Sequence, residues 1–305
     1  MFLFSNDLGV DLGTSNVLIY ADGKGLVVRE PSVVAMDKNT GKILQVGAAA
    51  RNMLGRTPGN VVAMHPLKDG TVSDHEMTVR MLQEMFKTAT KASFFTPKPR
   101  VVISVPSGVS EVEERSVINA AIEAGARRVF LIEEPLAAGL GAGLDIRGPS
   151  GHLVVDIGGG TTDIAIFAND SIKHTGVLAL GGQNLTNDIA FGLRTPMAAA
   201  EKIKIKHGAA IAEMVRPDEY IEVPSVGGRE PRRLSRQVLA EICEPRMEEI
   251  LTLLDQELVR SGLKNMIGAG VVLTGGTALI QGCQELGEQV FNLPTRIGYP
   301  RNVGG

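Results

Sequence analysis

The sequence predicts an α/β protein built from two similar domains, and three observations support this prediction. The chain has 305 residues, of which 44% are hydrophobic, enough for two domains of about 150 residues each. A pattern of strand, Gly-rich turn and strand occurs twice, beginning at Leu8 and at Leu153. Segments with the apolar spacing of helices lie between and after the two copies. Such a repeat indicates a duplicated architecture.

In the first half, runs of apolar residues predict strands. One strand begins at Leu8 and ends in a tight turn at Gly13-Thr14, and Asp22-Gly23 has the composition of a hairpin turn. Apolar spacing predicts a helix over residues 76–91, and Ser110 with Glu113 forms a capping box for a helix through Ala124. The further predicted strands are residues 17–20, 25–28, 100–105 and 129–132.

The second half repeats this order. Strands are predicted at residues 153–156 and 163–167, and a third at residues 271–274. Helices are predicted from Thr195 to Lys206, from Ser235 with an interruption at Pro245, and from Ala278 to Val290. Residues 216–234 are rich in Pro, Gly and Arg and predict short strands or loops.

The composition excludes several classes of protein. Charged residues make up 21% of the chain and the net charge is −3, which argues against disorder and gives no reason to expect nucleic-acid binding. No apolar run approaches the ~20 residues of a membrane-spanning helix, and the first residues lack a signal peptide's basic start. Cys243 and Cys283 form no metal pattern, so we expect two buried, reduced thiols in a cytoplasmic protein.

Each Gly-rich turn follows an aspartate at the end of a strand. Asp11 precedes Gly13-Thr14-Ser15, and Asp156 precedes Gly158-Gly159-Gly160-Thr161-Thr162. Glycine has no Cβ, so backbone N–H groups can form a nest for phosphate oxygens, while the hydroxyls add donors. The two carboxylates suit Mg²⁺ or its waters. Two such turns facing one cleft predict binding of a nucleoside triphosphate with Mg²⁺. Neither the P-loop nor the Rossmann fingerprint is present.

Three segments together resemble the ATP-site motifs of the actin superfamily. They are Asp11-Leu-Gly-Thr-Ser-Asn16, Asp156-Ile-Gly-Gly-Gly-Thr-Thr-Asp163 and Leu273-Thr-Gly-Gly-Thr-Ala278. A fourth segment, Ile103-Ser-Val-Pro-Ser-Gly108, resembles the connection between the two domains of that fold. The resemblance implies an actin-like ATPase fold of the α/β class, with two similar domains around a nucleotide cleft.

The two halves resemble different bacterial actin families. Residues 1–150 resemble domain I of the MreB family, in segments such as Glu30-Pro-Ser-Val-Val-Ala35, with a small subdomain at about 32–65. Residues 151–305 resemble domain II of the FtsA family, in segments such as Leu239-Ala-Glu-Ile-Cys-Glu-Pro-Arg246, with a small subdomain at about 196–261. We therefore expect an MreB/FtsA hybrid that stops before the C-terminal helix with which both families return to domain I.

The resemblance implies roles for individual residues. Glu134 matches the acidic residue that positions the attacking water in MreB-type actins, and Thr161 would assist it. Asp11 and Asp156 would hold Mg²⁺, through water. Glu201 and Lys204 match a ribose-contacting pair and share a helix face. The implied nucleotide-binding residues are Asp11, Gly13, Thr14, Ser15, Asn16, Asp156, Gly158, Gly159, Gly160, Thr162, Glu201, Lys202, Ile203, Lys204, Gly275, Gly276, Thr277 and Ala278.

Simpler interpretations of these residues stay open at this point. Glu134 also fits a favourable charge at the start of a helix. Glu201 and Lys204 also fit an exposed ion pair, and Gly275-Gly276 a plain turn between a strand and a helix.

The implied function is that of an ATP-binding bacterial actin that polymerises into membrane-associated filaments for cell shape, with slow ATP hydrolysis. Phe2-Leu3-Phe4 is either a frayed terminus or a small membrane-binding foot at the inner face of the cytoplasmic membrane. The main alternative is an FtsA-type adaptor that links FtsZ to the membrane, with residues 209–261 gripping the acidic FtsZ tail through Arg229, Arg232, Arg233 and Arg236. A sugar kinase or a chaperone-type ATPase of the same superfamily is a remote alternative.

Overall fold

The computed structural model describes residues 7–54, 59–68, 70–91, 97–144, 151–169 and 171–301. These residues divide into two compact units, with the boundary between Ala137 and Ala138, and Arg301 belongs to the first unit. The boundary therefore lies inside helix α4 (Glu134–Gly141) rather than at residue 150. The reason is packing: a Cβ at Gly139 would lie 3.4 Å from the Phe167 ring and 3.6 Å from Val154, both in the second unit.

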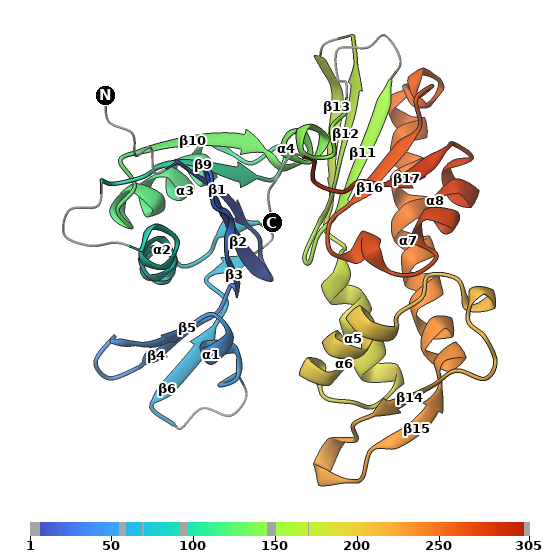
Figure 1. Ribbon diagram of the computed structural model, residues 1–305, viewed down its shortest axis with the longest axis horizontal. Coiled ribbons are helices and arrows are strands. Elements are labelled where there is room, and N and C mark those ends of the chain that lie inside the picture. Colours follow the sequence, from blue (N-terminus) through green and yellow to red (C-terminus); the bar gives the residue numbers. More distant parts are fainter. Residues whose placement is uncertain are drawn as a thin grey trace. The chain divides into compact units, whose positions relative to one another are not determined.

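The first unit contains a five-stranded mixed sheet in the order β10-β9-β1-β2-β3 (Figure 1). Its strands are β1 (Asp7–Leu12), β2 (Asn16–Ala21), β3 (Gly25–Pro31), β9 (Arg100–Val105) and β10 (Arg128–Glu133). The strands β1, β2 and β3 form an antiparallel meander, whereas β9 runs parallel to both β1 and β10. The predicted hairpin at Asp22-Gly23 is confirmed.

Two helices pack together on this sheet. Helix α2 (His75–Thr90) begins where the Asp74 side chain accepts a hydrogen bond from the Met77 N–H group, at 3.0 Å. Helix α3 (Glu111–Glu123) begins with the predicted capping box, which is confirmed by reciprocal hydrogen bonds of Ser110 and Glu113. The apolar face of α2 joins the strands in one core, with the buried side chains Met77, Met81, Leu82, Met85 and Phe86.

A small three-stranded sheet, β5-β4-β6, with helix α1 forms the rest of the first unit together with a short hairpin. The elements are β4 (Val34–Asp37), β5 (Ile43–Val46), α1 (Ala48–Arg51), β6 (Val61–Met64), β7 (Leu67–Lys68) and β8 (Thr71–Val72). A separate small core with Val33, Ala35, Ala50 and Val61 holds α1 on this sheet.

The second unit repeats the topology of the first. Its sheet has the order β13-β12-β11-β16-β17, in which β11, β12 and β13 form the antiparallel meander and β16 runs parallel to β11 and β17 (Figure 1). The strands are β11 (His152–Ile157), β12 (Thr162–Ala168), β13 (Ser171–Leu178), β16 (Val271–Thr274) and β17 (Thr295–Ile297). The predicted duplication of an α/β unit is therefore confirmed.

The helices and the small hairpin of the second unit share a large core with the sheet. The α-helices are α5 (Gly182–Gly192), α6 (Met197–His207), α7 (Arg236–Ser261) and α8 (Cys283–Phe291). The 3₁₀-helices are η1 (Ala212–Met214), η2 (Val226–Gly228), η3 (Lys264–Met266) and η4 (Thr277–Leu279). The hairpin consists of β14 (Tyr220–Val223) and β15 (Arg232–Ser235).

Two sequence predictions for these helices are wrong. Helix α7 continues through Pro245, because the side chains of Cys243 and Met247 on either side are fully buried and hold the chain in helical form. A helix does not run from Ala278 to Val290, because Gly282 takes a left-handed conformation, with φ of +80°. The chain instead forms η4 and starts α8 at Cys283.

We expect the buried face of α7 to carry much of the stability of the second unit. Leu251→Ala removes a fully buried side chain and should lower the free energy of unfolding by about 2–5 kcal/mol, because the cavity cannot close completely. Val259→Ala on the same helix, where the side chain is 60% exposed, should change it by less than about 0.5 kcal/mol. Chemical unfolding followed by circular dichroism measures both. Equal effects would contradict this assignment of the core.

Candidate functional site

The Gly-rich turn of the second unit is held by its carbonyl groups. The carbonyl oxygens of Gly158 and Gly159 accept hydrogen bonds from Gly182 N–H at 2.9 Å and Gln183 N–H at 2.7 Å, in the first turn of α5. The N–H groups of Gly159 and Gly160 donate to no other residue in the described part of the chain. The turn thus directs its acceptors to α5 and leaves donors for an anion, which is the arrangement of a phosphate nest.

The end of strand β16 closes on this turn. Thr277 Oγ1 donates to the Gly158 carbonyl at 3.3 Å, and Gly182 leaves no room for a side chain, since a Cβ there would lie 2.2 Å from Thr277 Oγ1. Gly275 has φ of +86°, and its Cβ would lie 2.4 Å from Asp156 Oδ1. The structure therefore brings Asp156, the turn, Gly275 and Thr277 together, as the sequence predicts.

The predicted pair on α6 lies at the same place. Lys204 Nζ donates to the Gly182 carbonyl and to Thr186 Oγ1, each at 2.9 Å, and forms an ion pair with Glu201 at 2.8 Å. Glu201 and Lys204 share a helix face that points to the start of α5. Their neighbours do not: Lys202 is exposed and Ile203 is buried in the core.

The threonines after the turn differ in their surroundings. Thr161 Oγ1 donates to Asp163 Oδ2 at 3.0 Å. Thr162 is fully buried and its hydroxyl donates to the Leu180 carbonyl at 2.8 Å, so that hydroxyl is directed away from the turn. The Ala278 side chain is also buried, in the core of the second unit.

In the first unit, Ser32 holds the equivalent turn. The Ser32 hydroxyl donates to the Gly13 carbonyl at 2.5 Å, and the Ser32 N–H group donates to the Ser15 carbonyl at 3.1 Å. The N–H groups of Gly13, Thr14 and Ser15 donate to no acceptor among the described residues. Thr14 Oγ1 accepts a hydrogen bond from Gly70 N–H at 2.8 Å, and Asn16 is exposed at the start of β2. This turn therefore also offers backbone donors.

Asp11 is the acidic residue beside that turn. The residue is exposed to solvent near the end of β1. Ser104 is the residue opposite Asp11 on β9, just as Thr274 is opposite Asp156 on β16. The described residues contain no cluster of three His, Cys, Asp or Glu side chains that could hold a metal ion.

Glu134 is the first residue of α4 and belongs to the first unit, whereas Thr161 belongs to the second. Glu133, the last residue of β10, directly precedes Glu134 and accepts a hydrogen bond at Oε2 from Oγ of the buried Ser107, at 2.8 Å. This hydrogen bond helps to hold the start of α4 in place. A carboxylate at this position also stabilises the N-terminal end of the helix.

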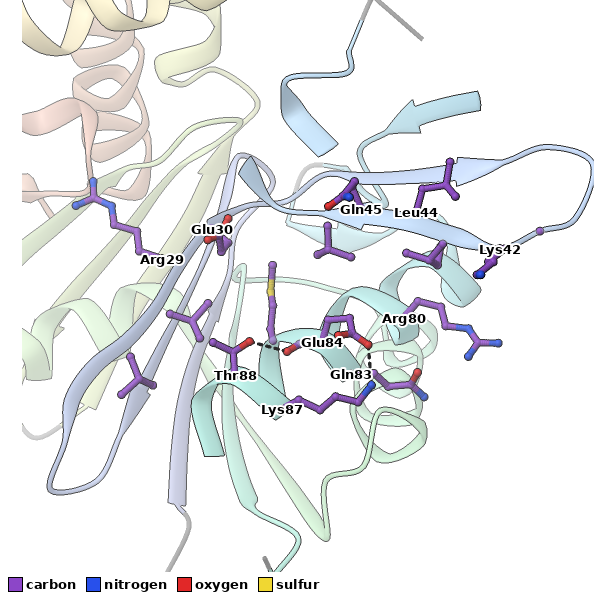
Figure 2. A pocket seen from close by; sticks show the side chains of 16 residues that line it. Arg29, Glu30, Lys42, Leu44, Gln45, Arg80, Gln83, Glu84, Lys87 and Thr88 are labelled. Atoms are coloured by element: carbon purple, nitrogen blue, oxygen red, sulfur yellow. Dashed lines mark hydrogen bonds and ion pairs between the residues drawn. The ribbon is translucent and has the colours of Figure 1, made fainter. Parts of the chain in front are cut away.

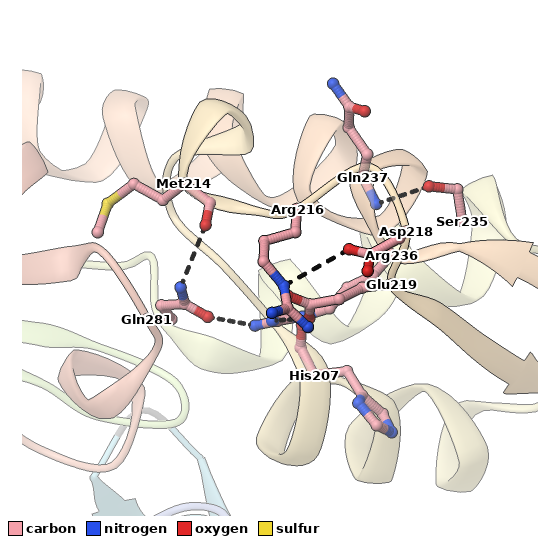
Figure 3. Close-up of polar contacts among 9 residues, drawn as sticks. All are labelled: His207, Met214, Arg216, Asp218, Glu219, Ser235, Arg236, Gln237 and Gln281. Carbon is pink, nitrogen blue, oxygen red and sulfur yellow. Dashed lines mark hydrogen bonds and ion pairs between the residues drawn. The ribbon is translucent and has the colours of Figure 1, made fainter.

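The arginines expected to grip an acidic tail are mostly engaged within the second unit. Arg236 bonds the His207 carbonyl and Glu219 Oε2, at 2.8 and 2.6 Å, and also contacts Gln281 (Figure 3). Arg233 lies over the Tyr220 ring at 4.3 Å, and Arg232 donates to the Leu193 carbonyl. These contacts join α6, the β14–β15 hairpin and the segment before α8, so a structural role accounts for three of the four side chains.

Comparisons with known proteins identify the family. The family model described as MreB/Mbl protein matches residues 5–301. The chain is 39% identical to the cell shape-determining protein Mbl of Bacillus subtilis (strain 168), over 97% of this chain and 92% of that protein. This chain belongs to the MreB/Mbl family.

The same comparisons bear on the expected hybrid. The MreB/Mbl match continues through residues 151–301, where the sequence predicts an FtsA-like domain II, so the expected hybrid is not supported. Identity to the cell shape-determining protein MreB of Escherichia coli (strain K12) is 38%, over 96% of this chain and 88% of that protein.

Solved structures confirm the actin-like α/β fold of this MreB/Mbl chain. The crystal structure of MreB5 of Spiroplasma citri bound to ADP has a TM-score of 0.80 and 31% identity, covering 95% of this chain and 91% of that one. The same protein has also been solved bound to AMPPNP, with a TM-score of 0.81. The MamK double helical filament, at 23% identity and a TM-score of 0.75, supports the fold alone.

Sequence reasoning missed several residues that shape the site. Gly181-Gly182, Thr186 and Ser32 hold the two turns or the Glu201–Lys204 pair, yet none was assigned a role from the sequence. The available signal was local: Gly181 and Gly182 immediately precede the amphipathic run of α5, where Asn184 accepts a hydrogen bond from Gly181 N–H at 2.9 Å. A glycine pair at a helix start indicates close approach of another backbone.

We expect Gly275 and Gly276 to respond differently to an added methyl group. Gly275→Ala forces a Cβ to 2.5 Å from the Ile157 carbonyl oxygen at a positive φ, and should lower the free energy of unfolding by at least about 1–2 kcal/mol. Gly276→Ala places its Cβ in open space and should leave stability within about 0.5 kcal/mol. Thermal unfolding of both variants is the measurement, and equal melting temperatures would contradict the close approach of β16 and β11.

Proposed function

We propose that this MreB/Mbl-family chain is a bacterial actin that binds ATP with Mg²⁺, hydrolyses it slowly and assembles into filaments that determine cell shape. The single observation that carries the nucleotide part is the turn Gly158–Thr161, where α5 uses the carbonyls of Gly158 and Gly159 while the N–H groups of Gly159 and Gly160 have no acceptor among the described residues. Family membership supports the role in cell shape, since relatives are named cell shape-determining proteins. A relative bound to ADP and to AMPPNP supports ATP as the ligand.

Phosphate oxygens would bind the two Gly-rich turns. The N–H groups of Gly159 and Gly160 would donate to them in the second unit, as would those of Gly13, Thr14 and Ser15 in the first. The open space beside Gly276 and the face of Glu201 and Lys204 suit the adenosine. Four of the residues named from the sequence would contribute only through their backbone or their packing: Lys202, whose side chain is exposed on another face of α6, and Ile203, Thr162 and Ala278, whose side chains are buried.

Mg²⁺ fits this donor set as an ion held mainly by phosphate and water. Each turn has one carboxylate beside it at the end of a strand, Asp11 in the first unit and Asp156 in the second. A single carboxylate suits contact with Mg²⁺ through a bound water better than it suits a site in which protein atoms supply every ligand. When bound, the ion would neutralise phosphate charge. Glu134 would orient the attacking water and accept its proton, with the Thr161 hydroxyl, itself positioned by Asp163, assisting.

The filament role is preferred to that of an FtsZ adaptor. A relative by fold forms a double helical filament, whereas Arg232, Arg233 and Arg236 are engaged in internal contacts. Binding to the inner face of the membrane is proposed from Phe2-Leu3-Phe4, which lie outside the described residues. Within the described ranges, no helix combines the length and the apolar character that crossing a membrane requires.

Asp156→Asn should weaken binding of ATP with Mg²⁺ by about 2–3 kcal/mol, roughly 30- to 150-fold, because metal-bound water loses its charged acceptor. Isothermal titration calorimetry measures the affinity, and pelleting of filaments should then require correspondingly more ATP. Asp22→Asn, in the exposed hairpin turn, is the matched control and should bind as the parent does. Unchanged affinity in Asp156→Asn would remove the basis for the proposed metal site.

Glu134→Gln should keep ATP bound within about twofold and reduce phosphate release at least ~10²-fold, the scale of a lost general base. Phosphate release during polymerisation is the measurement, and filaments should persist longer after ATP is added. Glu111→Gln changes an acidic residue in the first turn of another helix and controls for charge at a helix start. Loss of ATP binding together with phosphate release would show that Glu134 is structural.

A further inference from the structure

A groove of about 750 Å³ lies within the first unit, away from every residue assigned to the nucleotide. It lies between strand β3, strand β5 with the turn before it, and one face of helix α2 (Figure 2). Its volume falls within the range of about 300–1,000 Å³ that is usual for ligand sites in proteins. Nothing in the proposed function uses this groove.

The groove runs along the edges of two strands. Strand β3 ends the large sheet and strand β5 ends the small one, so in the described part of the chain each has one unpaired edge. Successive side chains of a strand point to opposite faces, yet the consecutive residues Val27–Glu30 and Ile43–Val46 all line the groove. The groove therefore meets both strands edge-on, over about 13 Å for four residues. Unpaired N–H and C=O groups on such an edge are a template for another strand.

The uncompensated charge around the groove is positive. The Glu84 carboxylate pairs with Lys87 at 2.7 Å, and Glu30 Oε2 accepts a hydrogen bond from Ala48 N–H at 2.8 Å. Arg29, Lys42 and Arg80 form no ion pair with any described residue. Figure 2 shows Lys42 beside β5 and Arg80 on α2 at the same end of the groove, with Arg29 at the other end.

Part of the groove's lining is apolar. Val27, Ile43 and Val46 line it, are half-buried and pack against the core of the first unit. The exposed Leu44 and Gln45 stand on the β5 side. An occupant that fits would have apolar side chains for this part of the lining, acidic side chains for Lys42 and Arg80, and a backbone free to pair with a strand.

We propose that this groove binds an acidic segment of a partner protein in an extended conformation, which adds as a strand to the free edge of β5. Main-chain hydrogen bonds to β5 supply the affinity, because an edge strand offers them along its whole length. Alternate side chains of the segment give specificity, with carboxylates at Lys42 and Arg80 and apolar groups against Ile43 and Val46. The groove shares no residue with the two Gly-rich turns or the other residues assigned to the nucleotide, and this binding goes beyond the proposed function.

A short fluorescein-labelled peptide in which valine and glutamate alternate tests this proposal. Titrated into the full chain at low salt without nucleotide, it should bind with micromolar affinity, followed by fluorescence anisotropy. The double variant Lys42→Glu and Arg80→Glu should weaken binding at least about tenfold. The matched control, Lys38→Glu with Arg51→Glu, makes the same charge change at exposed positions of the same small subdomain outside the groove, and should bind as the parent does. Thermal unfolding of each variant verifies that it is folded.

Hydrogen exchange distinguishes strand addition from charge attraction alone. Bound peptide should protect amides within residues 43–46, and a peptide with proline at alternate positions, which lacks the N–H groups, should not bind. No binding of the valine–glutamate peptide, equal weakening in both double variants, or binding without protection of residues 43–46 would each overturn the proposal. If the residues proposed to bind the nucleotide proved wrong, this proposal would still stand, because the groove shares no residue with them.

Discussion

The candidate site depends on where the backbone carbonyl groups of two turns are used. In the second unit the first N–H groups of α5 take the carbonyls of Gly158 and Gly159, and in the first unit Ser32 takes those of Gly13 and Ser15. A peptide group has a donor and an acceptor on opposite sides, so fixing the acceptor inward leaves the donor outward. In the proposed function, phosphate binding at either turn would therefore depend on hydrogen bonds that do not involve the phosphate itself.

The duplicated topology explains why the two turns correspond, but the devices that hold them differ. Both sheets have the same order of strands, and Asp11 and Asp156 face Ser104 and Thr274 across the parallel strand. A helix start holds the turn in the second unit, whereas a single buried serine does so in the first. In the second unit, the turn is hydrogen-bonded to α5, and Lys204 of α6 is hydrogen-bonded to the Gly182 carbonyl at the start of α5. A movement of either helix would therefore displace the turn.

Strands and their turns could be predicted from the sequence because their signals are local. Runs of β-branched residues and the Asp-Gly-Thr pattern were sufficient for the sheets and for both turns. Helix α7 could not be predicted through Pro245, because burial on both sides outweighs the lost hydrogen bond. Among site residues, helical spacing places Glu201 and Lys204 on one face of α6 and Lys202 and Ile203 on others. The prediction that all four contact the nucleotide therefore included two side chains that point in other directions.

The end strands of the two sheets show how duplicated units diverge. Strand β13 ends the second sheet and lies beside α7, where His174 Nε2 is 3.3 Å from Glu257 Oε1 and a Cβ at Gly176 would lie 3.7 Å from the Glu257 side chain. Strand β3 holds the equivalent position in the first unit, where it contacts helix α2 and residues 27–30 line the groove together with that helix. The proposed acidic segment pairs with β5, the end strand of the small sheet, because an uncovered strand edge invites pairing and Lys42 and Arg80 have no ion-pair partner among the described residues.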